Sequence, residues 1–169
     1  MRPLLMACVV ASLAAGLAQA APAPRVSIAG FAQLSAPLPY PYDERADANA
    51  VVALAKARAR SSHKRLLIIL GANWCADCRI LAAVMALPEV KAFVQAHYVS
   101  ANVDVGRFDK NLQIPARYGL QGRLQGVPTL LVVDPVHDRL IDAANAAALA
   151  DARHMSPQAL ADWLARWTS

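Results

Sequence analysis

An apolar run followed closely by two cysteines constrains this chain more than any other feature. Residues 66–70 read Leu-Leu-Ile-Ile-Leu, which is typical of a strand buried on both faces of a sheet. Cys75 and Cys78 follow with the spacing Cys-x-x-Cys, where a segment of helical periodicity begins. The N-terminus of a helix carries partial positive charge, which stabilises a thiolate. The pattern predicts a strand, a tight loop and a helix that present two sulfurs able to close a disulfide.

The first twenty residues predict a secretory signal peptide. Arg2 supplies a short positive region, residues 4–17 are apolar and alanine-rich, and residues 18–20 read Ala-Gln-Ala, a cleavage signal. We expect cleavage after Ala20 and a periplasmic mature protein. A lipoprotein would use Cys8, but the apolar stretch before it is too short. No later segment has the roughly eighteen uninterrupted apolar residues of a transmembrane helix, so no stable membrane insertion is expected after cleavage.

Signal removal would leave Cys75 and Cys78 as the remaining cysteines of the three in the chain. Without a disulfide framework, the fold must depend on burial, which a domain of about 150 residues can supply. The 17 basic and 12 acidic residues give a mild positive charge. Its densest stretch, residues 56–65, is explained by a solvated helix end, and no aromatic residues are interleaved with it. Nucleic acid is therefore not an expected partner.

The chain divides into three predicted regions: the signal peptide 1–20, a proline-rich extended segment 21–45, and one domain spanning 46–169. Five prolines favour loose or extended structure in the second region. Tyr40 and Tyr42 within this segment are candidates for anchoring it to the surface of the domain.

Hydrophobic periodicity predicts alternating elements within the domain. Helices are expected at 47–62, 75–87, 89–97, 112–118 and 156–167, and strands at 65–70, 98–103, 129–133 and 139–143. In the first helix, Val51, Leu54 and Ala55 have the spacing of an inward face. In the last, Ser156 is a candidate N-cap. This order predicts an α/β fold with a central mixed β-sheet flanked by helices on both faces.

The Cys-x-x-Cys motif has three chemical interpretations. A redox pair uses one thiolate to attack a substrate disulfide and the second to resolve the mixed disulfide. A zinc site needs two further ligands, yet the motif does not recur and no histidines are suitably paired; the histidines are His63, His97, His137 and His154. A purely structural disulfide would close a short loop and stabilise the fold weakly. The redox pair is the favoured interpretation.

Position within the predicted helix assigns different roles to the two cysteines. Cys75 lies in the first turn, where the thiolate is favoured, and is the expected nucleophile. Cys78 lies a turn deeper, should be less exposed, and is the expected resolving thiol. The carboxylate of Asp77 should oppose thiolate formation at Cys75, whereas Arg79 should favour it, and the sequence leaves the balance open.

Further motifs resemble the thioredoxin superfamily over residues 47–168. Residues 74–78, Trp-Cys-x-x-Cys after an apolar strand, match its active-site motif, and residues 126–129, Gly-Val-Pro-Thr before a strand, match its cis-proline loop. Tyr-Gly at 118–119 and Asn-Val-Asp at 102–104 match further positions. The resemblance implies a thioredoxin fold.

The resemblance also implies a function, as a periplasmic thiol-disulfide oxidoreductase with the catalytic dithiol Cys75 and Cys78 and with neither metal nor organic cofactor. In the family, the cis-proline packs against the disulfide and the residue before it pairs with extended substrate chain. The implied substrate-binding residues are Trp74, Ala76, Asp77, Val127 and Pro128. Expected partners are protein dithiols and disulfides, and a membrane protein that donates electrons.

Several positions depart from the family pattern. Ile69 stands where thioredoxins carry a buried acid, and Ser100 where they carry its lysine partner, so water, Asp77 or another carboxylate must accept the proton during resolution. The Ala-Asp dipeptide between the cysteines leaves the redox direction open. Residues 120–125 form an insertion that borders the expected substrate groove, either as a determinant of partner choice or as a tolerated surface loop.

The family analogy favours a reductase, and three alternatives remain. The first is a dithiol oxidase or isomerase. The second is a metallochaperone or assembly factor for copper or haem proteins, for which His137 or His154 would be the trial ligand. The third is a redox-inactive interaction module.

Overall fold

The computed structural model describes residues 19–141 and 143–169, so the expected signal peptide, with Cys8, lies outside the described residues except for its last two positions. In the described chain a four-stranded sheet has the order β2-β1-β3-β4. Its strands are β1 (Arg65–Gly71), β2 (Tyr98–Asp104), β3 (Thr129–Asp134) and β4 (Arg139–Leu140). Strand β1 pairs parallel with β2 and antiparallel with β3, so the sheet is mixed, as expected.

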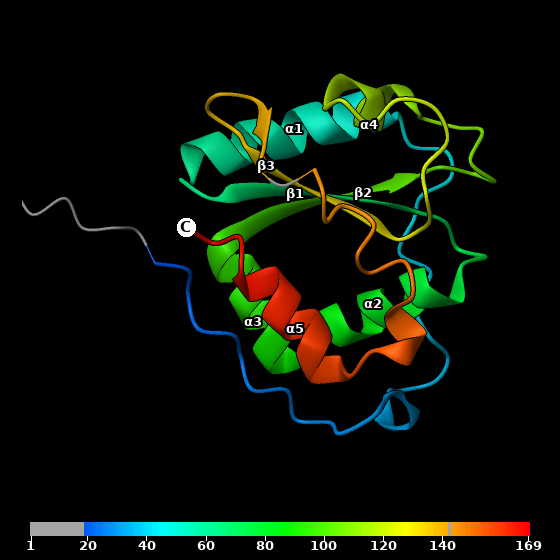
Figure 1. The fold of residues 1–169 in the computed structure, drawn as a ribbon, viewed down its shortest axis with the longest axis vertical. Helices are drawn as coiled ribbons and strands as arrows, with labels where there is room; N and C mark the ends of the chain where they lie inside the picture. Colours follow the sequence, from blue (N-terminus) through cyan, green and yellow to red (C-terminus); the bar gives the residue numbers. More distant parts are fainter. Residues whose placement is uncertain (1–18, 142) are drawn as a thin grey trace, which may run out of the picture.

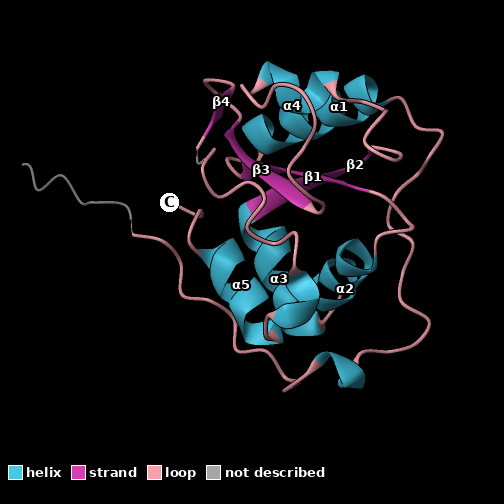
Figure 2. Ribbon diagram, turned by 45° about the vertical axis from the view of Figure 1, so that its right-hand side comes forward, coloured by secondary structure: helices cyan, strands magenta, loops and turns pink. Residues whose placement is uncertain are grey.

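Helices cover both faces of this sheet. Figure 1 shows α1 (Ala48–Ser61) and α4 (Gln113–Arg117) on one face, and α2 (Ala76–Met85), α3 (Pro88–His97) and α5 (Pro157–Ala165) on the other. Figure 2 shows the same separation from another side. The predicted α/β class, with a central mixed sheet flanked on both faces, is confirmed.

The apolar run forms the centre of the sheet. In β1 every residue from Leu66 to Gly71 is buried, because the strand lies between β2 and β3 and beneath helices on both faces. Its register places Ile69 opposite Asn102 on β2 and Leu130 on β3. The strand ends where the cysteine loop begins, so the loop is carried by the central, buried strand of the sheet.

Helix α1 begins as expected but buries a different face. Asp47 caps the helix, because its side chain accepts hydrogen bonds from the backbone N–H groups of Asn49 and Ala50. The buried residues are Ala48, Val52, Ala55 and Ala59. The predicted inward position of Leu54 is wrong, since its side chain is 54% exposed. The helix is so rich in alanine that a second stripe at helical spacing exists, and its small residues allow closer approach to the sheet.

Pro88 divides the next helical region, as predicted. Helix α2 ends at Met85, and α3 begins with Pro88 in its first turn, where the missing N–H costs nothing. In the described chain, no single helix has the length and apolar composition of a membrane span. The segments Ala76–Ala86 and Pro88–His97 have that length and composition only when they are counted together, and an 88° bend separates them.

The predicted C-terminal elements form with one difference in length. Strand β4 covers only Arg139–Leu140, shorter than the expected 139–143, although Ile141 still donates its N–H to Val132. Ser156 caps α5, accepting a hydrogen bond from Ala159 at 3.1 Å, and the helix buries its apolar stripe against the sheet.

The proline-rich segment wraps the domain as an extended strap. Its N–H groups are fastened to distant side chains: Ala21 to Thr168 at 2.6 Å and Val26 to Gln158 at 2.9 Å. Figure 1 shows the segment, in blue, running past α5 and α3 and rising beside α2 toward the sheet. It therefore brings Tyr42 to the end of β1, where the cysteines lie.

Candidate active site

The two cysteines occupy the start of α2 with their sulfurs buried. Cys75 is the N-cap residue, and its Sγ accepts a hydrogen bond from the backbone N–H of Cys78 at 3.2 Å. Both are free thiols. The exposed fraction is 5% for Cys75 and 1% for Cys78, so Cys78 is the more deeply buried, as predicted.

The surroundings separate the acidities of the two thiols. The pKa of Cys75 falls to about 7, chiefly because the Cys78 thiol and N–H hydrogen-bond to its sulfur, while burial opposes the shift. The same contact with Cys75, together with burial, raises the pKa of Cys78 well above its ordinary range. Cys75 therefore ionises first, which suits it to be the attacking sulfur.

The loop before β3 meets Cys75 from the other side. The Cys75 thiol donates a hydrogen bond to the carbonyl oxygen of Val127 at 3.3 Å, and the Val127–Pro128 peptide bond is cis. Thr129 fixes the loop by donating its hydroxyl hydrogen to Gly126 at 2.6 Å. Two motifs far apart in sequence thus share one site, as the family resemblance implies.

Asp77 is held by a residue that sequence reasoning missed. Its carboxylate accepts hydrogen bonds from Arg153 through the backbone N–H at 2.8 Å, Nε at 3.0 Å and Nη2 at 2.5 Å. Burial opposes ionisation of Asp77, but these hydrogen bonds outweigh it and hold the pKa of Asp77 below its ordinary value. An ion-paired carboxylate of lowered pKa is a weak base, so Asp77 is a poor proton acceptor for resolution.

The expected balancing role of Arg79 is not supported by its contacts. Its guanidinium donates to the carbonyl oxygens of Leu38 and Pro39 and lies 4.0 Å from the centre of the Tyr40 ring. Arg79 therefore holds the strap, while Arg153 offsets the charge of Asp77. The two residues of this ion pair are 76 positions apart, and no local pattern links them.

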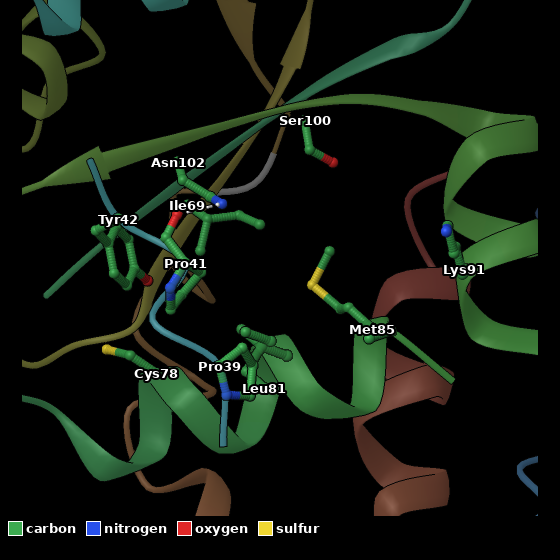
Figure 3. A pocket seen from close by; sticks show the side chains of 12 residues that line it. Pro39, Pro41, Tyr42, Ile69, Cys78, Leu81, Met85, Lys91, Ser100 and Asn102 are labelled. Carbon is green, nitrogen blue, oxygen red and sulfur yellow. Dashed lines mark hydrogen bonds between the residues drawn. The ribbon is translucent and has the colours of Figure 1, made fainter. Parts of the chain in front are cut away.

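A cavity of about 300 Å³ lies beside Cys78, which lines it. Figure 3 shows it between the sheet, α2 and the strap. Ile69 and Ser100, the two departures from the family pattern, both line it. The strap closes one side through Pro39, Pro41 and Tyr42, and Asn102 ties it to the sheet by donating to the Pro41 carbonyl oxygen at 3.0 Å.

Trp74 forms an exposed rim beside the buried thiols. Its side chain is 49% exposed, and its Nε1 donates to the carbonyl oxygen of Gly106 at 2.8 Å. Its ring centre lies 6.1 Å from that of Phe108, and Arg107 lies 5.5 Å above the ring. Ala76 is exposed on the same turn. The exposed part of the predicted substrate surface is thus aromatic and flanked by cations.

The 120–125 insertion reaches this surface. Arg123 lies 4.7 Å from the centre of the Phe108 ring, while Leu124 is buried in the core. The insertion also lines a groove of about 330 Å³ together with residues 143–147. Leu124 therefore anchors the insertion in the core, and Arg123 contacts the aromatic rim. These contacts favour a role for the insertion at the binding surface over the alternative of a surface loop without function.

The trial metal ligands contact carboxylates close to them in the sequence. His137 contacts Asp134 and His154 contacts Asp151, and both imidazole rings are exposed. Within residues 19–141 and 143–169, no group of three or more His, Cys, Asp or Glu side chains is placed to hold a metal ion.

A family model described as thioredoxin-like matches residues 47–135. The crystal structure of a disulphide isomerase from Xylella fastidiosa Temecula1 is similar, with a TM-score of 0.71 and 36% identity, over 78% of this chain and 99% of that chain. A protein of unknown function from Pseudomonas aeruginosa gives a TM-score of 0.38 at 19% identity, over 69% and 81%. No curated protein matches significantly.

Proposed function

The chain belongs to the thioredoxin-like family, and from that premise we propose that it reduces disulfides of exported proteins through a Cys75/Cys78 dithiol–disulfide cycle. Its family and fold are those of thiol-disulfide oxidoreductases. The observation that carries the proposal is the separation of the two thiols: Cys75 has a pKa of about 7 and faces the Val127 loop, while Cys78 is buried and held protonated.

The proposed cycle has two exchange steps. The Cys75 thiolate attacks a substrate disulfide, forming a mixed disulfide and releasing the first substrate thiolate. Cys78 then loses its proton and attacks Cys75 Sγ, which closes the Cys75–Cys78 disulfide and releases the second substrate thiolate. The substrate gains two electrons and the protein loses two. A membrane protein that donates electrons would return the pair to the dithiol.

Substrate would lie between the Trp74 rim and the Val127 loop. An extended chain pairs there with the backbone of Val127, in the manner of an added strand. This exchanges the Cys75–Val127 contact for a contact with substrate. Trp74 and Ala76 supply exposed surface, Pro128 fixes the loop, and Asp77 with Arg153 borders the nucleophile. The exposed aromatic side chain of Trp74 suits protein substrates better than small disulfides.

The degree of thiolate stabilisation supports the reducing direction. In the family, a nucleophilic cysteine of pKa about 7 belongs to the reductant thioredoxin, and one of about 3.5 to a strong periplasmic oxidase. Cys75 resembles the former. Isomerisation is the second candidate, because the similar crystal structure is that of a disulphide isomerase.

Export to the periplasm is part of the proposal and is supported by residues 1–20 alone. Fractionation of cells that express the full chain tests it. The protein should appear in the periplasmic fraction with Ala21 as its first residue, and a full-length product retained in the cytoplasm would contradict export.

The decisive experiment is the equilibrium redox potential of the pair, measured against glutathione. A value near −270 mV supports a reductase, one near −180 mV an isomerase, and one near −120 mV an oxidase. Insulin-disulfide reduction with dithiothreitol gives the matching activity, with the Cys75→Ala, Cys78→Ala double variant as control. Activity equal to that control would contradict all three roles, and stoichiometric copper retention lost in Cys75→Ser would indicate a metallochaperone instead.

A further inference from the structure

Tyr42, on the strap, lies against the resolving cysteine. Its backbone is clamped to the loop before Cys75: Tyr42 N–H donates to Asn73 Oδ1 at 3.1 Å, and Asn73 Nδ2 donates to the Tyr42 carbonyl oxygen at 2.8 Å. The side chain is buried and lines the same cavity as Cys78. A residue outside the sheet and helices is thus fixed in the core by a two-bond clamp.

The Tyr42 hydroxyl and the Cys78 sulfur converge on one point. A Cβ built on Gly71 would lie 2.2 Å from Tyr42 Oη and 2.7 Å from Cys78 Sγ, so only a glycine leaves room for both atoms here. Figure 3 shows the hydroxyl and the sulfur near one another at the same end of the cavity. Residue 71 is also the last of β1, which ties this packing to the central strand.

In the dithiol this buried hydroxyl makes no hydrogen bond of regular geometry among the described residues, although it lies close enough to the Cys78 thiol to interact with it. A buried unpaired donor is unfavourable, and it is tolerated where a partner forms at another stage of function. The atom beside it that changes charge in the proposed cycle is Cys78 Sγ. Burial, and then the nearness of Cys78, raises the pKa of Tyr42 far above neutrality, so the hydroxyl stays a donor.

We propose that Tyr42 stabilises the Cys78 thiolate by donating a hydrogen bond to it during resolution, in a chain that has Ile69 where the family pattern places a buried acid. The inference rests on the proposed dithiol cycle. Cys78 gives its proton to solvent through the adjoining cavity, its thiolate attacks Cys75 Sγ, and the bond from Cys75 to substrate sulfur breaks. The departing substrate thiolate takes a proton from solvent, so Tyr42 is unchanged at the end of the step.

Few titratable or charged groups lie near the Tyr42 hydroxyl and the Cys78 sulfur. The titratable and charged groups that face the pair are Cys75 on α2, Asp104 at the end of β2, and Lys91 on α3 across the cavity. Lys110 lies 3.6 Å from Asp104 and offsets its charge. The backbone N–H of Ala72 is a neutral donor to Cys78 and lowers its pKa, and the Tyr42 hydroxyl acts in the same direction from a side chain.

The test separates the two steps of the cycle in Tyr42→Phe, which removes only the unpaired hydroxyl. Attack by Cys75, measured as its alkylation rate, should change by less than about twofold. Resolution, measured as decay of an acid-quenched mixed disulfide by mass spectrometry, should slow by about tenfold, as for loss of a hydrogen bond to a charged group. Tyr40→Phe is the matched control, since Tyr40 lies on the same strap and is 66% exposed.

A second measurement keeps the inference independent of the cycle. In a Cys75→Ser background, ultraviolet absorbance of the thiolate reports the titration of Cys78, and adding Tyr42→Phe should move its midpoint to higher pH. An unmoved midpoint together with resolution at the wild-type rate would overturn the role of Tyr42. If the wild-type protein reduces no disulfide, the proposed function fails, while this titration still decides whether Tyr42 stabilises the thiolate.

Discussion

The two sulfurs of the site lie in contrasting surroundings. On the Cys75 side, the polar groups are satisfied: the thiol donates to Val127, and Asp77 is paired with Arg153. On the Cys78 side, the wall is mostly apolar, a cavity of about 300 Å³ is present, and the Tyr42 hydroxyl makes no hydrogen bond of regular geometry among the described residues. The polar groups around Cys75 have their hydrogen-bond partners in the dithiol. In our proposal, the Tyr42 hydroxyl gains its full partner only when Cys78 becomes a thiolate.

This difference teaches that the two exchange steps depend on different parts of the chain. The first step depends on α2, the loop before β3 and Arg153. The second depends on the strap and on the end of β1. A substitution on one side should therefore affect one step and leave the other nearly unchanged, and the following variants test that separation.

Serine substitution of the two cysteines should give the largest and most distinct effects. Cys75→Ser removes the attacking thiolate and should abolish insulin reduction and mixed-disulfide formation alike. Cys78→Ser keeps the first step and should accumulate mixed disulfides that resolve only with added thiol. Non-reducing electrophoresis after acid quench measures both. Accumulation in Cys75→Ser instead would reverse the assigned roles.

Gly71→Ala should damage the Cys78 side by overpacking. The added methyl would sit 2.2 Å from Tyr42 Oη and 2.7 Å from Cys78 Sγ. We expect a loss of about 1–3 kcal/mol in the free energy of unfolding and slower resolution, because both atoms must move. Urea denaturation and quenched-flow trapping measure these.

Gly30→Ala is the control for that variant, since a Cβ there meets nothing within 4 Å. It should unfold at the wild-type urea concentration. Equal stability of the two alanine variants would show that the hydroxyl and the sulfur are not confined at residue 71.

Arg153→Ala should alter the Cys75 side alone. Cys75 alkylation in the wild-type protein should rise with pH through a midpoint near pH 7, because the thiolate forms above the pKa and is lost below it. Without Arg153 the Asp77 charge is uncompensated, which raises the pKa of Cys75 and lowers the rate below pH 7 by about threefold.

Adding Asp77→Asn to Arg153→Ala should restore the alkylation rate, because it removes the opposing carboxylate. Resolution by Cys78 should be the same in all three proteins. A change in resolution as large as the change in alkylation would break the separation between the two sides.

Arg123→Ala should have the smallest effect, and only on substrate binding. It removes the cation over Phe108 at the aromatic rim, and we expect KM for a protein substrate to rise by about two- to threefold with kcat unchanged. Steady-state insulin reduction measures this. Lys64→Ala, at a distance from the rim, is the control, and an equal rise in KM there would indicate a general effect of charge.

The sequence predicted those features that depend on neighbouring residues. The buried run 66–70, the proline break at Pro88 and the cap at Ser156 each follow from a local pattern, and each is present. The inward face of α1 was misassigned at Leu54 because alanine has no strong preference for core or surface. Periodicity then fits more than one stripe, and close packing against the sheet selects between them.

The parts of the site that escaped prediction are brought together by tertiary packing. Arg153 reaches Asp77 from a short 3-10 helix, Ala152–His154, whose position depends on the whole fold. Arg79 is expected from its nearness in sequence to favour the Cys75 thiolate, although its side chain turns toward the strap. Tyr42 was recognised as an anchor, but its proximity to Cys78 depends on the path of an extended segment, which no periodicity describes.

The fastening of the strap has a consequence for the order of assembly. The partners of Ala21 and Val26 are Thr168 and Gln158, so contacts of this segment close loops of 147 and 132 residues. Such distant contacts form late, because loop closure costs entropy before any contact repays it. During synthesis the first half of the strap emerges long before its partners exist. The first residues of the strap are thus among the last to find their places, whereas Tyr42, whose clamp to Asn73 spans only 31 residues, can be set beside the resolving sulfur much earlier.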